Sequence, residues 1–369
     1  MSKKLLMTAS VWQHIANFHL PYLRDFKRLG WETHVGCASV SIDEPSIDKA
    51  IDLPFEKRFL SVRNFRTACK LRNLVKEEKY DLIITHTTLA AFFTRLAVKG
   101  LKNRPPLVNV MHGYLFDDMS SPLRRTILLG AERIMAPETD LLLTMNQWDY
   151  ECAQKYRLGK RIEKIPGMGV DFSRLHGATK EDGLHLRSEL GIPEDAFVLI
   201  YPAEFSKRKS QHMLIEAMQD LPETIRLVLC GTGELLEPCR KLAEKLKVHD
   251  RVLFPGQVDN IAVWYRMADA IAASSRSEGL PFNIMEAMYL GLPVIASDVK
   301  GHADLIEDGV NGLLYPYGCV EKFTDFVRQL MQDSGLREKY ISNNQSAADR
   351  FKLQSVLLGI MGNYLSVFN

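Results

Sequence analysis

The segment SEGLPFNIMEAM, residues 277–288, carries two glutamates separated by seven residues, Glu278 and Glu286. A buried carboxylate is unfavourable unless a partner pairs with it. Glu278 follows the apolar run AIAAS, and a Gly-Leu-Pro turn leads from it into a short helix-type stretch. Unpaired backbone N–H groups at a helix N-terminus form a binding site for phosphate groups. The arrangement predicts a diphosphate-binding loop at residues 279–283, with the Glu286 carboxylate accepting hydroxyl groups of a ribose.

A purely structural role is the alternative for this pair of glutamates. Glu278 would then be a charge stabilised by the helix dipole, and Glu286 would be an exposed helix residue. Pro281 suits the first helical position, where its missing N–H is no loss. The apolar residues on both sides of Glu286 argue against an exposed carboxylate. We therefore expect both glutamates to face a ligand.

Three consecutive cations, Lys207, Arg208 and Lys209, follow the strand-type run AFVLIYPA. When a sugar–diphosphate bond breaks, negative charge grows on the leaving phosphate, and cations aimed at it stabilise the transition state. We expect Lys209 and Arg208 to have this role; the alternative is a solvated surface loop. The GTGE segment at 231–234 lacks the third glycine of a dinucleotide fingerprint and predicts a tight turn near the nucleotide.

His112 directly follows the strand-type run PLVNVM. Ligands bind beyond the carboxyl ends of parallel strands, so His112 is a candidate for the reacting centre, with a hydrogen-bonded core histidine as the alternative. His86 follows DLIIT and is expected to be structural. The six cysteines are scattered without a C-x-x-C, and no Asp-x-Asp occurs. We therefore expect no metal, neither at a zinc site nor at the diphosphate, and no cofactor.

Short strand-type runs alternate with amphipathic helix-type runs throughout the chain. Such an alternation predicts β/α units with parallel sheets, and near-continuous apolar strands indicate burial on both faces. The runs of the first half are 4–10, 32–39, 81–86, 106–113, 140–145 and 161–167. Those of the second half are 196–203, 226–231, 251–256, 270–274 and 293–297. The polar, glycine-rich segment 167–195 is the expected linker.

Bulk composition describes a globular protein. Its 369 residues suit two domains, 46% are hydrophobic and 25% charged, and no apolar run reaches the length of a membrane span. The start of the chain is expected to be a first strand rather than a signal peptide. With the scattered cysteines, this favours a cytoplasmic location. Nucleic-acid binding has no support, because net charge is only +2 and no aromatic–basic motif occurs.

Charge is divided unevenly along the chain. Residues 1–175 hold 27 Lys and Arg against 19 Asp and Glu, a net +8, whereas residues 176–369 hold 20 against 26, a net −6. The densest basic stretch, 57–79, places Arg63, Arg66 and Lys70 on one helical face. This face is either an ordinary solvated surface or a dock for anionic lipid head groups.

Residues 275–315, with Glu278 and Glu286, resemble the signature stretch of glycosyltransferase family 4. The segments CGTGELLEPC, MHGYLF and IPGMGVDFSRL resemble other parts of that family, so the resemblance covers nearly the whole chain. It implies the GT-B fold, an α/β architecture of two Rossmann-like domains facing a shared cleft. The implied domains are an acceptor-binding domain at 1–170, a nucleotide-sugar-binding domain at 171–350, and a C-terminal helix at 351–369 that crosses back to the first domain.

The resemblance also implies roles for individual residues. Glu286 would bind the nucleotide ribose, Glu278 the transferred sugar, and Lys209 the diphosphate, with His112 near the reacting centre. The donor-binding loop would comprise Gly279, Leu280, Pro281, Phe282 and Asn283.

Two positions depart from the family pattern. Glu204 stands where many members have an arginine, so Arg208 is expected to supply the missing cation, and Glu204 is included in the donor site. The family's glycine-rich loop after the first strand is replaced by SVWQHIANFHL. His14, Asn17 and His19 in this segment are candidates for contacts with the acceptor or the phosphates.

The resulting prediction is a retaining, metal-independent glycosyltransferase. It would move a hexose or N-acetylhexosamine from a UDP-sugar to a glycan on a polyprenyl diphosphate, at the inner membrane face, in exopolysaccharide, capsule or O-antigen synthesis. The rivals are a nucleotide-sugar epimerase, an inverting transferase of the same fold, and a non-catalytic nucleotide-sugar-binding subunit. A glycoside hydrolase using the two glutamates as acid and nucleophile is disfavoured by the phosphate-binding loop between them.

Overall fold

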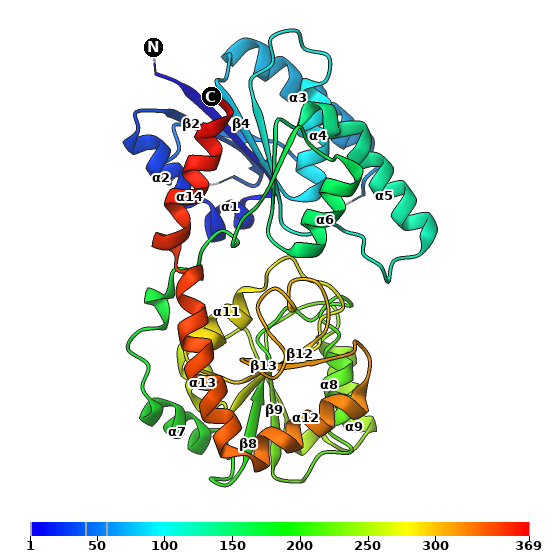
Figure 1. The fold of residues 1–369 in the computed structure, drawn as a ribbon, viewed down its shortest axis with the longest axis vertical. Helices are drawn as coiled ribbons and strands as arrows, with labels where there is room; N and C mark the ends of the chain where they lie inside the picture. The colour runs from blue at the N-terminus through cyan, green and yellow to red at the C-terminus, as the bar shows by residue number, and fades with distance from the viewer. Residues whose placement is uncertain (1, 41–42, 57, 369) are drawn as a thin grey trace. The chain divides into compact units, whose positions relative to one another are not determined.

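The computed structural model describes residues 2–40, 43–56 and 58–368, which fold as two compact units. The first unit comprises residues 1–168 together with 354–369, and the second comprises 169–353. In each unit, helices surround a parallel sheet of buried strands, which Figure 1 shows separately for the two halves of the chain. Both are Rossmann-like units with a parallel sheet, as the sequence predicted.

The first unit is built on a seven-stranded sheet in the order β3-β2-β1-β4-β5-β6-β7. Every neighbouring pair is parallel. Apolar residues fill the central strands because helices cover both faces of the sheet. The strands are β1 (Lys4–Val11), β2 (Glu32–Ala38), β3 (Lys49–Asp52), β4 (Leu82–His86), β5 (Leu107–Met111), β6 (Leu141–Thr144) and β7 (Arg161–Lys164).

Several helices of the first unit begin at a residue whose side chain caps them. Ser61, Ser121 and Asn146 each cap a helix by accepting a backbone N–H through the side chain, which explains where α3, α5 and α6 begin. The helices are α1 (Trp12–Phe18), α2 (Leu20–Arg28), α3 (Val62–Glu78), α4 (Thr88–Val98), α5 (Pro122–Met135) and α6 (Gln147–Tyr156).

The second unit has a six-stranded sheet in the order β10-β9-β8-β11-β12-β13. All its neighbouring pairs are parallel, so the carboxyl ends of β8, β9 and β11 lie at one edge. Ligands bind at this edge in open α/β sheets. The strands are β8 (Phe197–Ile200), β9 (Ile225–Cys230), β10 (Val252–Gly256), β11 (Ala270–Ala273), β12 (Val294–Ser297) and β13 (Gly312–Tyr315).

The segment 167–195 was expected to be the linker, but from residue 169 it belongs to the second unit and contains a helix. The chain passes between units at residues 168 and 169, and α7 packs on α10. Thr179 and Asp182 form a capping box that starts α7, and Gly183 lies close to the Arg266 backbone. The helices are α7 (Lys180–Glu189), α8 (Gln211–Ala217), α9 (Leu236–Lys245), α10 (Ile261–Met267), α11 (Phe282–Tyr289), α12 (Val320–Gln332) and α13 (Ser334–Ala348).

The last helix, α14 (Leu353–Leu365), completes the first unit. In Figure 1 it lies beside α2. Tyr364 is fully buried and contacts the rings of Tyr22 and Phe26, with ring centroids 5.9 and 6.2 Å away. The Tyr22 hydroxyl donates a 2.7 Å hydrogen bond to the Met168 carbonyl. Among the described residues, no helix has the length and apolar character needed to cross a membrane.

Candidate active site

Glu278 lies in the loop after β11 and is almost fully buried. Its carboxylate pairs with Lys209 Nζ at 2.7 Å and with Arg208 Nη1 at 2.5 Å, and it accepts a 2.6 Å hydrogen bond from Ser275 Oγ. Burial alone would raise the pKa of Glu278, but the two cations outweigh it and lower the pKa to about 2. We call Glu278, Lys209 and Arg208 the charge cluster; it carries one net positive charge.

Two loops from neighbouring strands hold the charge cluster together. Lys209 follows β8, and its carbonyl accepts a 2.9 Å hydrogen bond from Ser274 Oγ at the end of β11. The Arg276 N–H donates to the Arg208 carbonyl at 2.8 Å. Ser210 has the left-handed φ of +53°, which turns the chain sharply into α8. Burial lowers the pKa of Lys209, consistent with an ammonium group largely removed from water.

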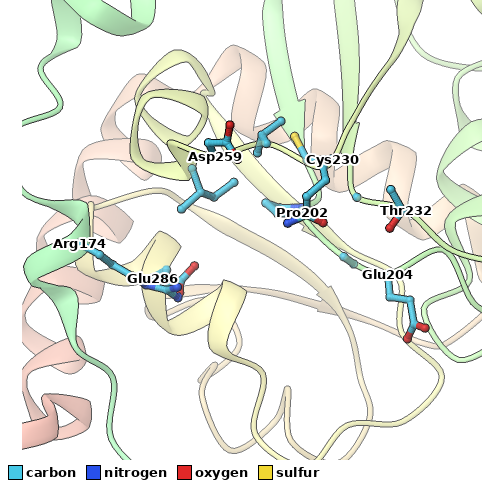
Figure 2. Close-up of a pocket in the computed structure, with 12 residues that line it drawn as sticks. Arg174, Pro202, Glu204, Cys230, Thr232, Asp259 and Glu286 are labelled. Atoms are coloured by element: carbon cyan, nitrogen blue, oxygen red, sulfur yellow. The ribbon is translucent and has the colours of Figure 1, made fainter. Parts of the chain in front are cut away.

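Glu286 lies one turn inside α11 and lines a pocket of about 560 Å³. Its carboxylate accepts a 3.1 Å hydrogen bond from the Tyr265 hydroxyl and forms an ion pair with Arg174. Figure 2 shows Arg174 and Glu286 meeting at one end of this pocket, with Glu204 at the other. The alternative of an exposed Glu286 is thereby excluded. The lining residues are Arg174, Pro202, Ala203, Glu204, Cys230, Gly231, Thr232, Gln257, Val258, Asp259, Ile261 and Glu286.

The predicted phosphate-binding loop, residues 279–283, leads from the charge cluster into α11. Pro281 precedes the helix as its N-cap, so it lies one residue earlier than the sequence predicted. Leu280 and Pro281 are buried, whereas Gly279, Phe282 and Asn283 are partly exposed. The Asn283 side chain donates a 2.9 Å hydrogen bond to the Pro202 carbonyl, which ties the helix start to the pocket. The loop therefore connects Glu278 and Glu286 through one short helical turn.

The GTG turn at 231–233 forms part of the pocket wall. Gly231 and Gly233 have φ values of +135° and +148°. A Cβ at Gly231 would lie 2.2 Å from the Ala203 carbonyl oxygen, and one at Gly233 would lie 2.4 Å from that of Phe205. Only glycine allows the backbones after β8 and β9 to approach this closely.

The histidine candidates lie in the first unit. His112 follows β5, and His14 lies in α1; both are partly exposed. His19 and His86 have no exposed surface. Burial lowers the pKa of all four imidazoles, to about 4 for His14 and well below the usual 6.5 for the others, so they are neutral near pH 7.

The structure separates some predicted site residues from others. His19 is fully buried and has no surface open to an acceptor or a phosphate. Asn17 is exposed and accepts a 2.6 Å hydrogen bond from Gln13. Glu204 lines the pocket but does not join the charge cluster, whereas Arg208 does. The predicted residues thus form two groups, the charge cluster with its neighbouring pocket in the second unit and the histidines in the first.

Sequence reasoning assigned no role to several residues that hold the site. Arg174 and Tyr265 both contact the Glu286 carboxylate, and Ser275 contacts that of Glu278. The Tyr201 hydroxyl lies 2.7 Å from Ser275 Oγ. His302 is buried near Glu278, and burial lowers the pKa of its imidazole to about 4. Arg174 stood in the IPGMGVDFSRL segment that carried the family resemblance, and this was its one detectable signal.

Comparison with known proteins identifies the family. The model "Glycosyltransferase Family 4" matches residues 22–174, and "Glycosyl transferases group 1" matches 184–347. The chain is 34% identical to the putative glycosyltransferase EpsD of Bacillus subtilis over 95% of its own length and 93% of the relative's. The chain belongs to glycosyltransferase family 4. The family predicted from the sequence is thus confirmed.

More distant similarities are found to a curated transferase and to solved structures. It is 25% identical, over 74% of its length and 72% of the relative's, to an Escherichia coli UDP-Gal:alpha-D-GlcNAc-diphosphoundecaprenol alpha-1,3-galactosyltransferase. The structure of Anabaena Alr3699/HepE in complex with UDP-glucose matches with a TM-score of 0.80 and 23% identity, covering 98% of this chain and 99% of that one. The glycosyltransferase WaaG, involved in lipopolysaccharide biosynthesis, matches at 0.75 with 21% identity, covering 98% and 99%. These structural likenesses confirm the GT-B fold.

Proposed function

We propose that this glycosyltransferase moves a hexose or N-acetylhexosamine from a UDP-sugar, with retention of anomeric configuration, to a glycan carried on a lipid diphosphate. The single observation that carries this proposal is the placement of the charge cluster and the Glu286 pocket at the two ends of the loop 279–283. This spacing suits a diphosphate with a nucleoside on one side and a sugar on the other. Two similar proteins support uracil as the base: the Escherichia coli transferase is named for UDP-Gal, and the Anabaena structure contains UDP-glucose.

The pocket residues divide the donor between them. The ribose hydroxyls donate hydrogen bonds to the Glu286 carboxylate. Tyr265 and Arg174 hold this carboxylate in its orientation. The diphosphate binds to the N-terminus of α11 and to Lys209 and Arg208. Glu278 accepts hydrogen bonds from hydroxyls of the transferred sugar. The low pKa of Glu278 keeps it an acceptor at neutral pH.

The transfer step follows from the charges at this site. The bond between the anomeric carbon and the β-phosphate oxygen breaks, and the two cations stabilise the charge that grows on that oxygen. The acceptor hydroxyl attacks the anomeric carbon from the same face and passes its proton to the leaving phosphate. The bond to the acceptor oxygen therefore forms with the original configuration. Lys209 and Arg208 supply the positive charge at the diphosphate, so we propose that this step requires no metal ion.

Nucleotide release tests the proposal. Wild-type protein is incubated with UDP-, GDP- and ADP-sugars in EDTA, with and without lipid-linked acceptors, beside Glu278→Gln and Lys209→Ala. We expect release from one UDP-sugar, reduced about 100-fold or more in both variants. Lys209→Ala removes a cation that faces the charge developing on the leaving phosphate, and Glu278→Gln weakens the hydrogen bonds to the transferred sugar. Lys207→Ala, which changes an exposed neighbouring lysine, is the matched control and should retain activity.

Each outcome bears on a separate part of the proposal. Release in the Lys209→Ala variant at the wild-type rate would refute the diphosphate role of Lys209. Activity abolished by EDTA and restored by Mg²⁺ would refute metal independence. An inverted product anomer would identify an inverting transferase. Donor-induced thermal stabilisation without turnover in any acceptor mixture would favour a non-catalytic binding subunit.

A membrane-bound acceptor fits the surface of α5. Leu123, Ile127 and Ile134 are 72%, 61% and 58% exposed, and their spacing places them on one helical face. The exposed arginines Arg124 and Arg133 lie on the two sides of that face. In Figure 1, α5 lies at the outer side of its unit. An apolar face bordered by arginines is typical of a helix that lies in an anionic membrane surface.

The basic stretch on α3 is a weaker candidate for the same role. Arg63 pairs with Glu56 at 3.0 Å, and Lys70 Nζ donates a 2.7 Å hydrogen bond to the Asp52 carbonyl. Arg63, Arg66 and Lys70 are exposed, as predicted from the helical spacing. Lys57, at the start of this stretch, lies outside the described residues. We therefore propose α5 as the principal contact with the inner face of the cell membrane.

A further inference from the structure

Four histidines from separate segments of the first unit meet at the carboxyl edge of its sheet. His14 lies in α1 after β1, and His19 stands between α1 and α2. His86 is the last residue of β4, and His112 follows β5. One imidazole nitrogen of each lies within 4.8 Å of the corresponding nitrogens of the others. We call these residues the four-histidine cluster.

The hydrogen bonding within the four-histidine cluster is incomplete. His112 Nε2 lies 3.3 Å from His14 Nε2 and also 3.3 Å from His86 Nδ1. A neutral ring nitrogen has either one N–H or one lone pair, so His112 Nε2 can form a good hydrogen bond with only one of them. Both nitrogens of His19 and Nε2 of His86 are buried without a hydrogen-bond partner. Buried polar groups are normally paired, so this deficit requires an explanation.

Ring stacking alone accounts poorly for this deficit. His19 and His86 stack with their centroids 3.6 Å apart, and His14 meets His112 edge-on at 4.5 Å. Apolar side chains would pack equally well without unpaired nitrogens.

A metal ion would give partners to the buried nitrogens that the four-histidine cluster leaves unpaired. Neutral imidazole is a preferred ligand of zinc and related ions, with metal–nitrogen distances of about 2.0–2.1 Å. Four ligands placed tetrahedrally at that distance have nitrogens about 3.3 Å apart. The two His112 separations have this value. Calcium and magnesium prefer oxygen ligands, and the cluster offers none.

We propose that His14, His19, His86 and His112 bind one divalent transition-metal ion of the zinc, cobalt or nickel type. The ion would join α1, the start of α2 and the ends of β4 and β5. Its ligands belong to the first unit, whereas the proposed diphosphate site belongs to the second. The partly exposed His14 and His112 provide the route of entry.

Cobalt titration tests this proposal on the full-length protein, purified without a polyhistidine tag and stripped of metal. We expect one equivalent of Co²⁺ to bind with the intense visible absorption of a tetrahedral site, and Zn²⁺ to displace it and raise Tm. His14→Asn changes a partly exposed ligand, and His86→Ala changes a buried one. Each should weaken Co²⁺ binding at least tenfold. His185→Ala, which changes an exposed histidine outside the cluster, should bind Co²⁺ as the wild type does.

The titration has clear opposing outcomes. A folded wild type that binds less than one tenth of an equivalent of Co²⁺ and Zn²⁺, with unchanged Tm, would overturn the proposal. So would wild-type affinity in both His14→Asn and His86→Ala, because the ion would then lie elsewhere. Circular dichroism confirms that each variant is folded, and the His14→Asn variant keeps the test decisive if His86→Ala fails to fold. None of these readouts depends on sugar transfer.

Discussion

Glu278 shows how one buried carboxylate organises a site. It is held by two cations and a serine hydroxyl, each from a loop at the carboxyl edge of the same sheet. Removing one partner of a buried ion pair leaves an uncompensated charge, which is more damaging than losing the pair altogether. The charge cluster therefore contributes to folding as well as to the proposed chemistry.

Acid should weaken the second unit through Glu278. Its folded pKa of about 2 lies below the ordinary value of 4.5, so its stabilisation is complete above pH 4.5 and is lost as pH falls from 4.5 towards 2. The difference corresponds to about 3 kcal/mol of unfolding free energy. Urea unfolding across this range should show a shallower pH dependence for Glu278→Gln than for the wild type. Glu181→Gln, an exposed carboxylate, is the control, and an identical slope for Glu278→Gln and the wild type would contradict this assignment.

Gly231 should be intolerant of any side chain. In Gly231→Ala the new Cβ would overlap the Ala203 carbonyl, and we expect a loss of about 3 kcal/mol in unfolding free energy together with weaker UDP binding. Gly191 also has a positive φ, of +65°, but open space around its Cβ position. Gly191→Ala should therefore lose only about 1 kcal/mol, from the backbone conformation alone. Equal losses in the two variants, measured by thermal unfolding, would rule out the steric explanation.

Sequence patterns predicted residues that act within one segment better than residues that meet across the fold. Glu278, Glu286 and the glycine turn were recognisable because strand, loop and helix follow one another along the chain. The ion pair between Arg174 and Glu286 joins residues 112 positions apart, and no local pattern reveals it. The four-histidine cluster is similar: His112 and His86 were noted singly, whereas the convergence of four rings depends on strand order. The roles assigned to Lys209, Glu278 and His112 stay predictions until activity is measured.

Among the elements, α14 contributes a buried aromatic residue to the core of the first unit. Tyr364 is buried between Tyr22 and Phe26, and its hydroxyl has no hydrogen-bond partner. Tyr364→Ala should lower the unfolding free energy of the first unit by about 3–5 kcal/mol, as expected for a large aromatic removed from a core. Tyr364→Phe removes only the unpaired hydroxyl and should change stability by less than about 1 kcal/mol. Chemical denaturation measures both, and similar losses in the two variants would show that the hydroxyl is bonded.

Elements buried on both faces were the easiest to predict. All eleven predicted strand runs correspond to strands, and most of them are the continuous apolar runs typical of strands buried in a parallel sheet. β7, which reads RIEK and is largely exposed, is an exception. The two strands that were missed, β3 and β13, lie at sheet edges and are four residues long. β3 reads KAID with only Ile51 buried, so it lacks the apolar run. Helix α7 was missed because its glycine-rich surroundings concealed the capping box of Thr179 and Asp182.

The whole molecule is expected to bind anionic membranes through its first unit. A Leu123→Ser, Ile127→Ser double variant should lower vesicle binding at least about tenfold, because each leucine or isoleucine side chain contributes 1–2 kcal/mol or more when buried in the interface. Sedimentation with anionic phospholipid vesicles at low salt measures the effect. Leu184→Ser changes a leucine of α7 that is 58% exposed in the second unit and is the matched control. No binding by the wild type would refute the membrane proposal.

The architecture itself was predictable at this scale, although largely through the family resemblance. Alternating runs predicted two parallel-sheet units, and the resemblance added their type, which the comparisons confirm. Composition could not predict that the chain passes from one unit to the other after residues 168 and 353, because these positions depend on which helices pack against which sheet. The polar composition of 167–195 predicted a linker, yet most of this segment packs within the second unit.

The return of α14 to the first unit also bears on how the chain is made. The second unit, 169–353, is one continuous stretch and can fold as soon as it leaves the ribosome. The first unit is synthesised earlier, but the surface of Tyr22 and Phe26 remains uncovered until Tyr364 has emerged. Domains usually fold in the order of synthesis. Here the half translated first is expected to be completed last, and its exposed aromatic surface would need protection from aggregation in the interval.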